Sequence, residues 1–75
     1  MEGYGTFIWK KGDKYQGHFE NDEKQGFGIF WWNDGNRYEG NFINDKRNGR
    51  GKMYYKDGKT KEGFWKNDEF KNNNY

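Results

Sequence analysis

Few side chains in this sequence could take part in catalysis or bind a metal. Serine and cysteine are absent and His18 is the single histidine, so neither a nucleophile–base pair nor the triad of acyl transfer can be assembled. A zinc site also needs further His or Cys ligands beside a histidine. We therefore predict a protein without catalytic residues, metal or cofactor, in which His18 lies partly exposed on a strand.

Carboxylates do recur at a fixed interval, in Asn-Asp pairs that end at Asp22, Asp45 and Asp68. Calcium takes about six to eight oxygen ligands, and one aspartate per pair supplies far too few. Asn and Asp side chains commonly hydrogen-bond their own backbone in tight turns. We interpret these pairs as turns and not as metal sites.

Composition narrows the class of protein. The chain has 75 residues, of which 23% are aromatic, while Leu, Val and Ala are absent; this excludes a conventional helical core and argues against disorder. The 14 basic and 12 acidic residues are interleaved and give a net charge of +2, so we predict no nucleic-acid partner. The absence of cysteine fits an intracellular protein.

A repeat of 23 residues organises the chain. A shift by this period superimposes all 12 glycines, for instance Gly5 on Gly28 and Gly51. We predict one domain over 1–75, built from units 3–25, 26–48 and 49–71 and followed by a polar tail, 72–75.

Within each unit, large side chains and glycines alternate with period two, which indicates strands and not helices. Asn33-Asp34-Gly35 favours a tight turn with glycine in a left-handed conformation, and the segment from Asn44 to Asn48 suits a loop of four or five residues. The prediction is an all-β, single-layer antiparallel meander of about six strands, near 4–10, 14–20, 27–33, 37–43, 50–56 and 60–66.

Loop lengths predict the register. A three-residue loop 34–36 and a four-residue loop 45–48 would place Phe30 opposite Gly40, and Phe42 opposite Gly51. Rings and glycines would then alternate as on a checkerboard, each ring covering the bare backbone of a neighbouring glycine. The residues to which we assign this structural role are Gly17, Gly28, Phe30, Trp32, Tyr38, Gly40, Phe42, Gly51 and Trp65.

A single-layer sheet with rings on both faces cannot bury them by itself, and exposed apolar patches usually mark contact sites. The repeated face is predicted to pack: Trp9, Tyr15, Phe30, Trp32, Tyr38, Phe42 and Tyr55. The irregular face is predicted to contact a protein partner or a second copy as a homodimer: Ile8, Phe27, Ile29, Trp31, Ile43, Tyr54 and Phe64. The terminal strands also leave unpaired edges for a partner strand.

Anionic lipid is the alternative ligand. A basic-aromatic patch can hold an anionic headgroup, and each basic residue near a membrane surface adds about 1 kcal/mol. The candidate residues for a phosphoinositide or another anionic phospholipid are Lys46, Arg47, Arg50, Lys52 and Lys66. Nearby glutamates dilute their field, so a solvated surface is the interpretation that we prefer for these residues.

The order Tyr15-x-Gly17-x-Phe19, an Asn-Asp turn, Gly26-x-Gly28, an aromatic pair and Asp34-Gly35 resembles the MORN (membrane occupation and recognition nexus) repeat. The resemblance covers residues 3–71 and implies a strip of β-hairpins that acts as a module without chemistry of its own. Similar arrays occur in phosphatidylinositol-phosphate kinases, junctophilins and ciliary or cytoskeletal scaffolds. Lys61, Met53 and Phe70 depart from the pattern, which suggests that the last unit is a degenerate end.

Together these features predict a non-catalytic scaffold in an intracellular, cytoplasmic assembly associated with a membrane or the cytoskeleton. The abundance of Asn, Lys, Phe, Tyr and Ile is typical of AT-rich coding genomes, for which a cilium or the cell cortex is a natural location.

Overall fold

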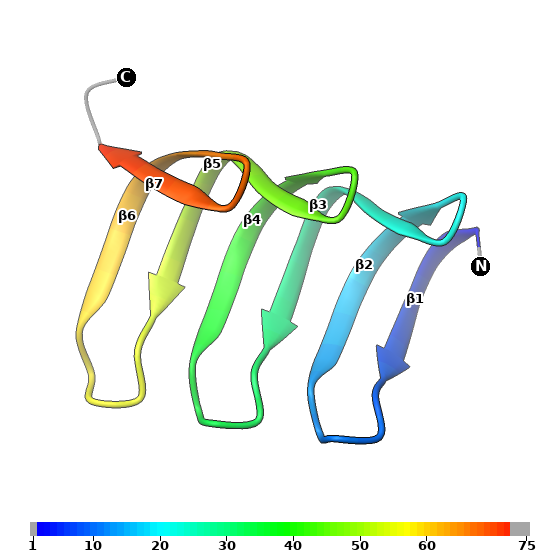
Figure 1. Ribbon diagram of the computed structural model, residues 1–75, viewed down its shortest axis with the longest axis horizontal. Helices are drawn as coiled ribbons and strands as arrows, with labels where there is room; N and C mark the ends of the chain where they lie inside the picture. Colours follow the sequence, from blue (N-terminus) through cyan, green and yellow to red (C-terminus); the bar gives the residue numbers. More distant parts are fainter. Residues whose placement is uncertain (1, 73–75) are drawn as a thin grey trace.

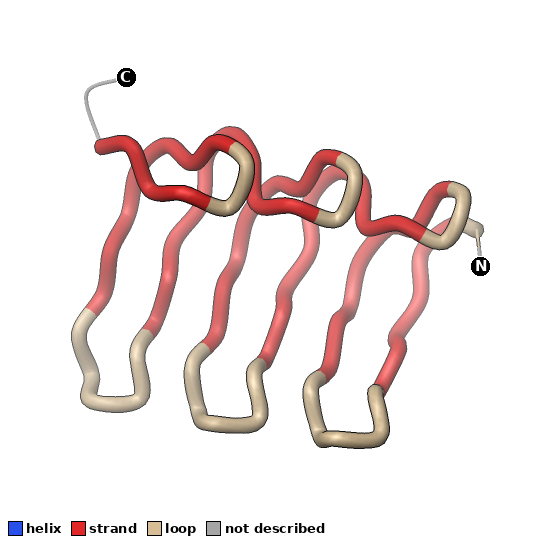
Figure 2. Tube along the Cα trace, in the orientation of Figure 1, coloured by secondary structure: helices blue, strands red, loops and turns tan. Residues whose placement is uncertain are grey.

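The protein is a single open sheet of seven antiparallel strands in chain order, as the computed structural model of residues 2–72 shows (Figure 1). The described residues contain no helix (Figure 2), which confirms the predicted all-β single-layer meander. The strands are β1 (Gly3–Ile8), β2 (Lys14–Glu20), β3 (Glu23–Trp31), β4 (Arg37–Ile43), β5 (Lys46–Tyr54), β6 (Thr60–Lys66) and β7 (Glu69–Asn72).

One kind of turn is a three-residue loop closed by glycine. Trp32 N donates to Asn36 O at 2.9 Å, and Gly35 N donates to Trp32 O at 3.1 Å. Gly35 has a φ of 103°, which is the left-handed position of such loops. The predicted length of three residues is right, but the loop is 33–35 and not 34–36.

The other kind of turn is the Asn-Asp pair, which forms a two-residue hairpin. Asn44 and Asp45 have φ values of 49° and 74°, and Ile43 pairs directly with Lys46. Asn and Asp tolerate this left-handed conformation because their short polar side chains bond locally. The predicted four-residue loop 45–48 is therefore wrong, and its residues from Lys46 onward belong to β5. The equivalent turn at 67–68 creates β7, a strand that the sequence analysis missed.

These turns change the predicted register by two residues. Phe30 lies opposite Tyr38 and not Gly40, and Gly51 lies opposite Gly40 and not Phe42. The checkerboard is therefore wrong. A shift by two keeps every side chain on its predicted face, but it brings the glycines together in one continuous row across six strands: Gly5, Gly17, Gly28, Gly40, Gly51 and Gly63.

Beside the glycine row the sheet bends. Between β2 and β3, residues 25–27 lie opposite His18 alone, and Gly26 within this bulge has a φ of 77°. Bulges of this kind kink a strand. The ends that carry the Asn-Asp turns consequently run at a steep angle to the long strands (Figures 1 and 2).

Two tyrosines lie over the glycine row and form the centre of the core. Tyr15 and Tyr38 are 0% exposed, and a Cβ atom added to Gly28 would lie only 2.6 Å from Cε1 of Tyr15. The Tyr38 hydroxyl donates to Asn41 O at 3.1 Å, beyond the bend. Rings cover glycines, as predicted, but the covering rings are those of Tyr15 and Tyr38 and not those of Phe30 and Phe42. The buried cluster is Tyr15, Phe19, Phe30, Tyr38, Phe42, Met53 and Trp65.

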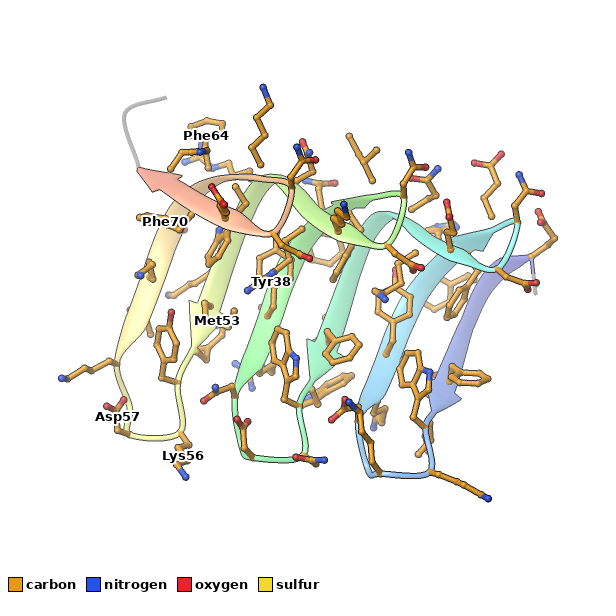
Figure 3. The ribbon with its side chains drawn as sticks, viewed as in Figure 1. Tyr38, Met53, Lys56, Asp57, Phe64 and Phe70 are labelled. Carbon is orange, nitrogen blue, oxygen red and sulfur yellow. The ribbon has the colours of Figure 1, made fainter. Side chains whose placement is uncertain are left out.

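In the first two units a cation lies near the buried tyrosine, and in the third unit the cation and the ring occupy each other's positions. Lys24 Nζ lies 5.8 Å from the Tyr15 ring, and Arg47 Cζ lies 5.9 Å from the Tyr38 ring. At the equivalent positions, the Lys61 ammonium lies 5.1 Å from the ring of Phe70, which projects from the same side of the sheet as Tyr38 (Figure 3). The cation–π contact is kept with its two partners exchanged.

We expect Gly28→Ala to lower the free energy of unfolding by about 1–3 kcal/mol, because the added methyl group overlaps the Tyr15 ring. Gly5 lies in the same row but has nothing within 4 Å of an added Cβ. Gly5→Ala should therefore change the stability by less than about 0.5 kcal/mol. Chemical denaturation measures both, and equal effects would contradict the packing of Tyr15 on Gly28.

Stability should also fall in alkaline solution. Burial raises the pKa of Tyr38 from 10.0 to about 12, so the neutral phenol stabilises the fold fully below about pH 10 and this contribution is lost as the pH rises toward about 12. We expect Tyr38→Phe to be less stable at neutral pH, since it loses the hydrogen bond to Asn41, but to show a smaller loss between about pH 9 and about pH 11. Denaturation at both pH values tests this, and parallel losses in the two proteins would refute it.

Candidate interaction surface

The aspartates of the Asn-Asp turns join neighbouring units. Asp45 Oδ1 accepts hydrogen bonds from the backbone N of Lys24 at 2.8 Å and from its Nζ at 3.1 Å, and Asp45 N donates to Lys24 O at 3.0 Å. Asp68 makes the same contacts with Arg47. The residues that the structure describes contain no cluster of His, Cys, Asp or Glu suited to a metal.

The packed face covers its own rings. Arg47 Cζ lies 4.9 Å from the Trp65 ring, and Lys24 Nζ lies 5.3 Å from Phe30. Three shallow hollows of about 380, 200 and 200 Å³ lie between the rings and the turns, and two of them include Lys24 and Asp45. Among the rings predicted to pack, Tyr15, Phe30, Tyr38 and Phe42 are buried, and Trp9, Trp32 and Tyr55 are partly buried against them.

The opposite surface of the sheet, which we call the back face, exposes large apolar side chains. Strand alternation and register place two rows across it: Ile8, Lys14, Trp31, Arg37, Tyr54 and Thr60, then Thr6, Gln16, Ile29, Glu39, Lys52 and Glu62. Among the residues predicted for contact, Ile8, Phe27 and Ile43 are 66%, 57% and 51% exposed. The other four, Ile29, Trp31, Tyr54 and Phe64, are half-buried on this face.

The residues predicted for protein contact did not include Tyr4, which also lies on this face. Tyr4 is 64% exposed, and its ring lies 5.3 Å from that of His18, which is itself exposed. Its even position in β1, shared with Ile8, predicts this face for it, but strand alternation does not predict how far its ring is exposed.

Cations cover most of the half-buried rings of the back face. Lys14 Nζ lies 4.5 Å from Trp31, and Arg37 Cζ lies 4.0 Å from Tyr54. Sequence reasoning did not find these contacts, because they depend on the register between strands. The apolar surface left open is therefore concentrated on Tyr4, Ile8, Phe27 and Ile43.

A shallow hollow of about 480 Å³ lies beside Phe27 on the back face, and its lining includes the backbone of Gly40 and Gly51. Arg50 and Tyr54 line it together with Glu39 and Glu62. Its lining includes Phe27, Tyr54 and Arg50, and aromatic residues and arginine are enriched at protein–protein interfaces.

The structure does not bring the five predicted lipid-binding residues into one patch. Arg47 lies on the packed face, where its Nε pairs with Asp68 at 3.1 Å. Lys52 lies directly between Glu39 and Glu62 on the neighbouring strands. Lys46, Arg50 and Lys66 are exposed. Among the described residues, no helix is long and apolar enough to span a membrane.

Comparison with protein families gives one match. The model of the MORN repeat matches residues 1–14, 15–37 and 38–60, with the 23-residue period but with units that begin at Tyr15 and Tyr38 and not at Gly26 and Gly49. MORN repeats are a non-catalytic module generally associated with membrane and protein interaction. No curated protein matches the chain.

We expect Arg47→Glu to lower the free energy of unfolding by roughly 1–3 kcal/mol, because it removes a cation from three rings and places a carboxylate beside Asp68. The neighbouring exposed Lys46 provides the control, and Lys46→Glu should change the stability by less than about 0.5 kcal/mol. Thermal and chemical unfolding measure the stability of both variants. If Arg47→Glu leaves the stability unchanged, the contacts of Arg47 with the rings and with Asp68 contribute little.

Proposed function

Because this chain belongs to the MORN repeat family, we propose that it is a non-catalytic scaffold that holds a partner protein on its back face. We place it in an intracellular assembly attached to a membrane or to the cytoskeleton. The single-layer sheet supplies a stiff surface for this role, and the turns join its units through Asp45 and Asp68.

The observation that carries this proposal is the one-sided exposure of apolar side chains. Tyr4, Ile8, Phe27 and Ile43 are each more than half exposed and share the back face, whereas the packed face buries or partly buries its rings except Phe7 in β1, which is 38% exposed. Exposed apolar side chains that gather on one face typically mark a site of contact with a partner.

The charges of the back face favour a protein over a membrane. Glu39 and Glu62 flank Lys52 across the strands, and these carboxylates would repel an anionic lipid surface. A protein partner can pair with both signs of charge while its apolar groups cover Phe27 and Ile43.

We expect Phe27→Lys and Ile43→Lys, each made singly, to reduce partner recovery at least tenfold without unfolding the chain, since both side chains are exposed. Thr60→Lys is the control, because Thr60 is an exposed back-face residue away from the apolar patch. Tagged variants are purified from the native cells, and recovered proteins are quantified and then tested for direct binding in purified form. A directly binding protein that both back-face variants retain would overturn the proposal.

Anionic lipid is the second candidate, and one observation favours it. Lys46 lies directly opposite Ile43, and Arg50 lines the same hollow as Phe27, so exposed cations adjoin the apolar patch. Sedimentation with phosphoinositide-containing vesicles at two salt concentrations tests this candidate. Salt-sensitive binding that Lys46→Glu and Arg50→Glu abolish would support lipid, and absence of binding to the vesicles would dismiss it.

A further inference from the structure

The strand β1 is the only described strand without a charged side chain. Natural edge strands commonly carry charges that prevent pairing with other chains. Within the described residues β1 pairs with β2 alone, and its Tyr4, Phe7 and Ile8 are 64%, 38% and 66% exposed. By contrast, β6 and β7 at the other end of the sheet carry Lys61, Glu62, Lys66, Glu69 and Lys71. The β1 edge therefore lacks the usual protection.

Hydrogen-bonding groups of β1 point outward at alternate residues. Trp9 N donates to Asp13 O, and the same register pairs Phe7 with Tyr15 and Gly5 with Gly17. The direction of bonding alternates along an antiparallel strand, so these odd positions bond to β2. Tyr4, Thr6 and Ile8 consequently direct their backbone N–H and C=O groups away from the sheet.

We infer that β1 pairs with β1 of a second copy of this chain, antiparallel, across a two-fold axis at Thr6. In this register the outward groups of Thr6 meet those of Thr6 in the second copy, and those of Tyr4 meet those of Ile8. The pairing turns two open edges into one continuous sheet, and its two-fold symmetry closes the assembly at a dimer.

Side chains match in the same register. Tyr4 lies beside Ile8 of the second copy on the back face, an aromatic and β-branched pair of the kind that stabilises antiparallel strands, and the two Thr6 side chains are adjacent. On the packed face, Phe7 lies opposite Gly5 of the second copy and can cover its bare backbone.

Two neighbouring registers fit less well. A shift by one residue would place apolar side chains on the wrong face and would oppose outward-directed groups to inward-directed ones. A shift by two toward Gly5 would leave Ile8 unpaired and would bring Gly5 against Gly5. This edge pairing goes beyond the proposed scaffold function and does not depend on Phe27 or Ile43.

Cysteine cross-linking tests the register, because the chain has no cysteine of its own. Two Thr6→Cys strands would bring their Cα atoms to about 5.5 Å, within the range of a disulfide. In Ile8→Cys the two cysteines would lie four residues apart along the strands, about 13 Å, which is too far. We expect mild oxidation to cross-link Thr6→Cys and not Ile8→Cys; equal cross-linking of the two, or none, would overturn the pairing.

Light scattering tests the dimer itself. We expect the wild-type chain to reach twice the monomer mass with rising concentration. Thr6→Pro removes an outward N–H, and Thr6→Lys places two like charges at the axis, so both should remain monomeric. The second variant keeps the test valid if the first fails to fold.

Thr60→Lys in β6, and Phe27→Lys on the back face, should both dimerise as the wild type does. A wild-type monomer at all concentrations, or a dimer that both Thr6 variants retain, would refute the inference. Loss of the dimer in Phe27→Lys alone would assign self-association to the back face instead.

Discussion

Contact between the Tyr15 and Tyr38 rings and the row of glycines is the interaction on which the rest of the structure depends. A single-layer sheet has no second layer to form a core, so it must pack side chains against its own backbone. Only glycine lets a ring approach the backbone so closely, since a Cβ at Gly28 or Gly51 would overlap the tyrosine above it. The hydroxyl of each tyrosine then bonds a carbonyl beyond the bend and holds the two parts of the sheet at their angle.

This core uses one face of the sheet and leaves the other open. On the packed face, Lys24 and Arg47 lie over the rings of the core. Lys24 pairs with Asp45 and Arg47 pairs with Asp68, and each pair joins one unit to the next. The arrangement is local, because each unit contacts only its neighbours, as in other repeat proteins. The back face is free of these constraints. Its cations lie over Trp31 and Tyr54, while Tyr4, Ile8, Phe27 and Ile43 stay uncovered. The proposed binding of a partner through the back face rests on this division.

Arg47 shows why the candidate site was only partly predictable. Its place beside Lys46 and Arg50 in the sequence suggested one basic patch, yet it lies on the packed face and pairs with Asp68. The period-two alternation of Lys24, Gly26, Gly28 and Phe30 in the preceding unit extends the strand back to Lys24, which is the equivalent of Arg47. The same alternation therefore placed Arg47 in a strand and on the packed face. The predicted loop 45–48 left Arg47 outside the strand, because a left-handed conformation was not expected at both Asn44 and Asp45. The apolar residues of the back face needed alternation alone.

The sequence by itself determined the repeat, the strands and the face on which each side chain lies, since these depend on periods along the chain. Only the tertiary structure decided which residues lie opposite one another. Register depends on turn geometry, and an error of two residues leaves the alternation intact while it changes every neighbour. For this reason the glycine row, the cation over each ring and the bend of the sheet could not be derived from the pattern of residues.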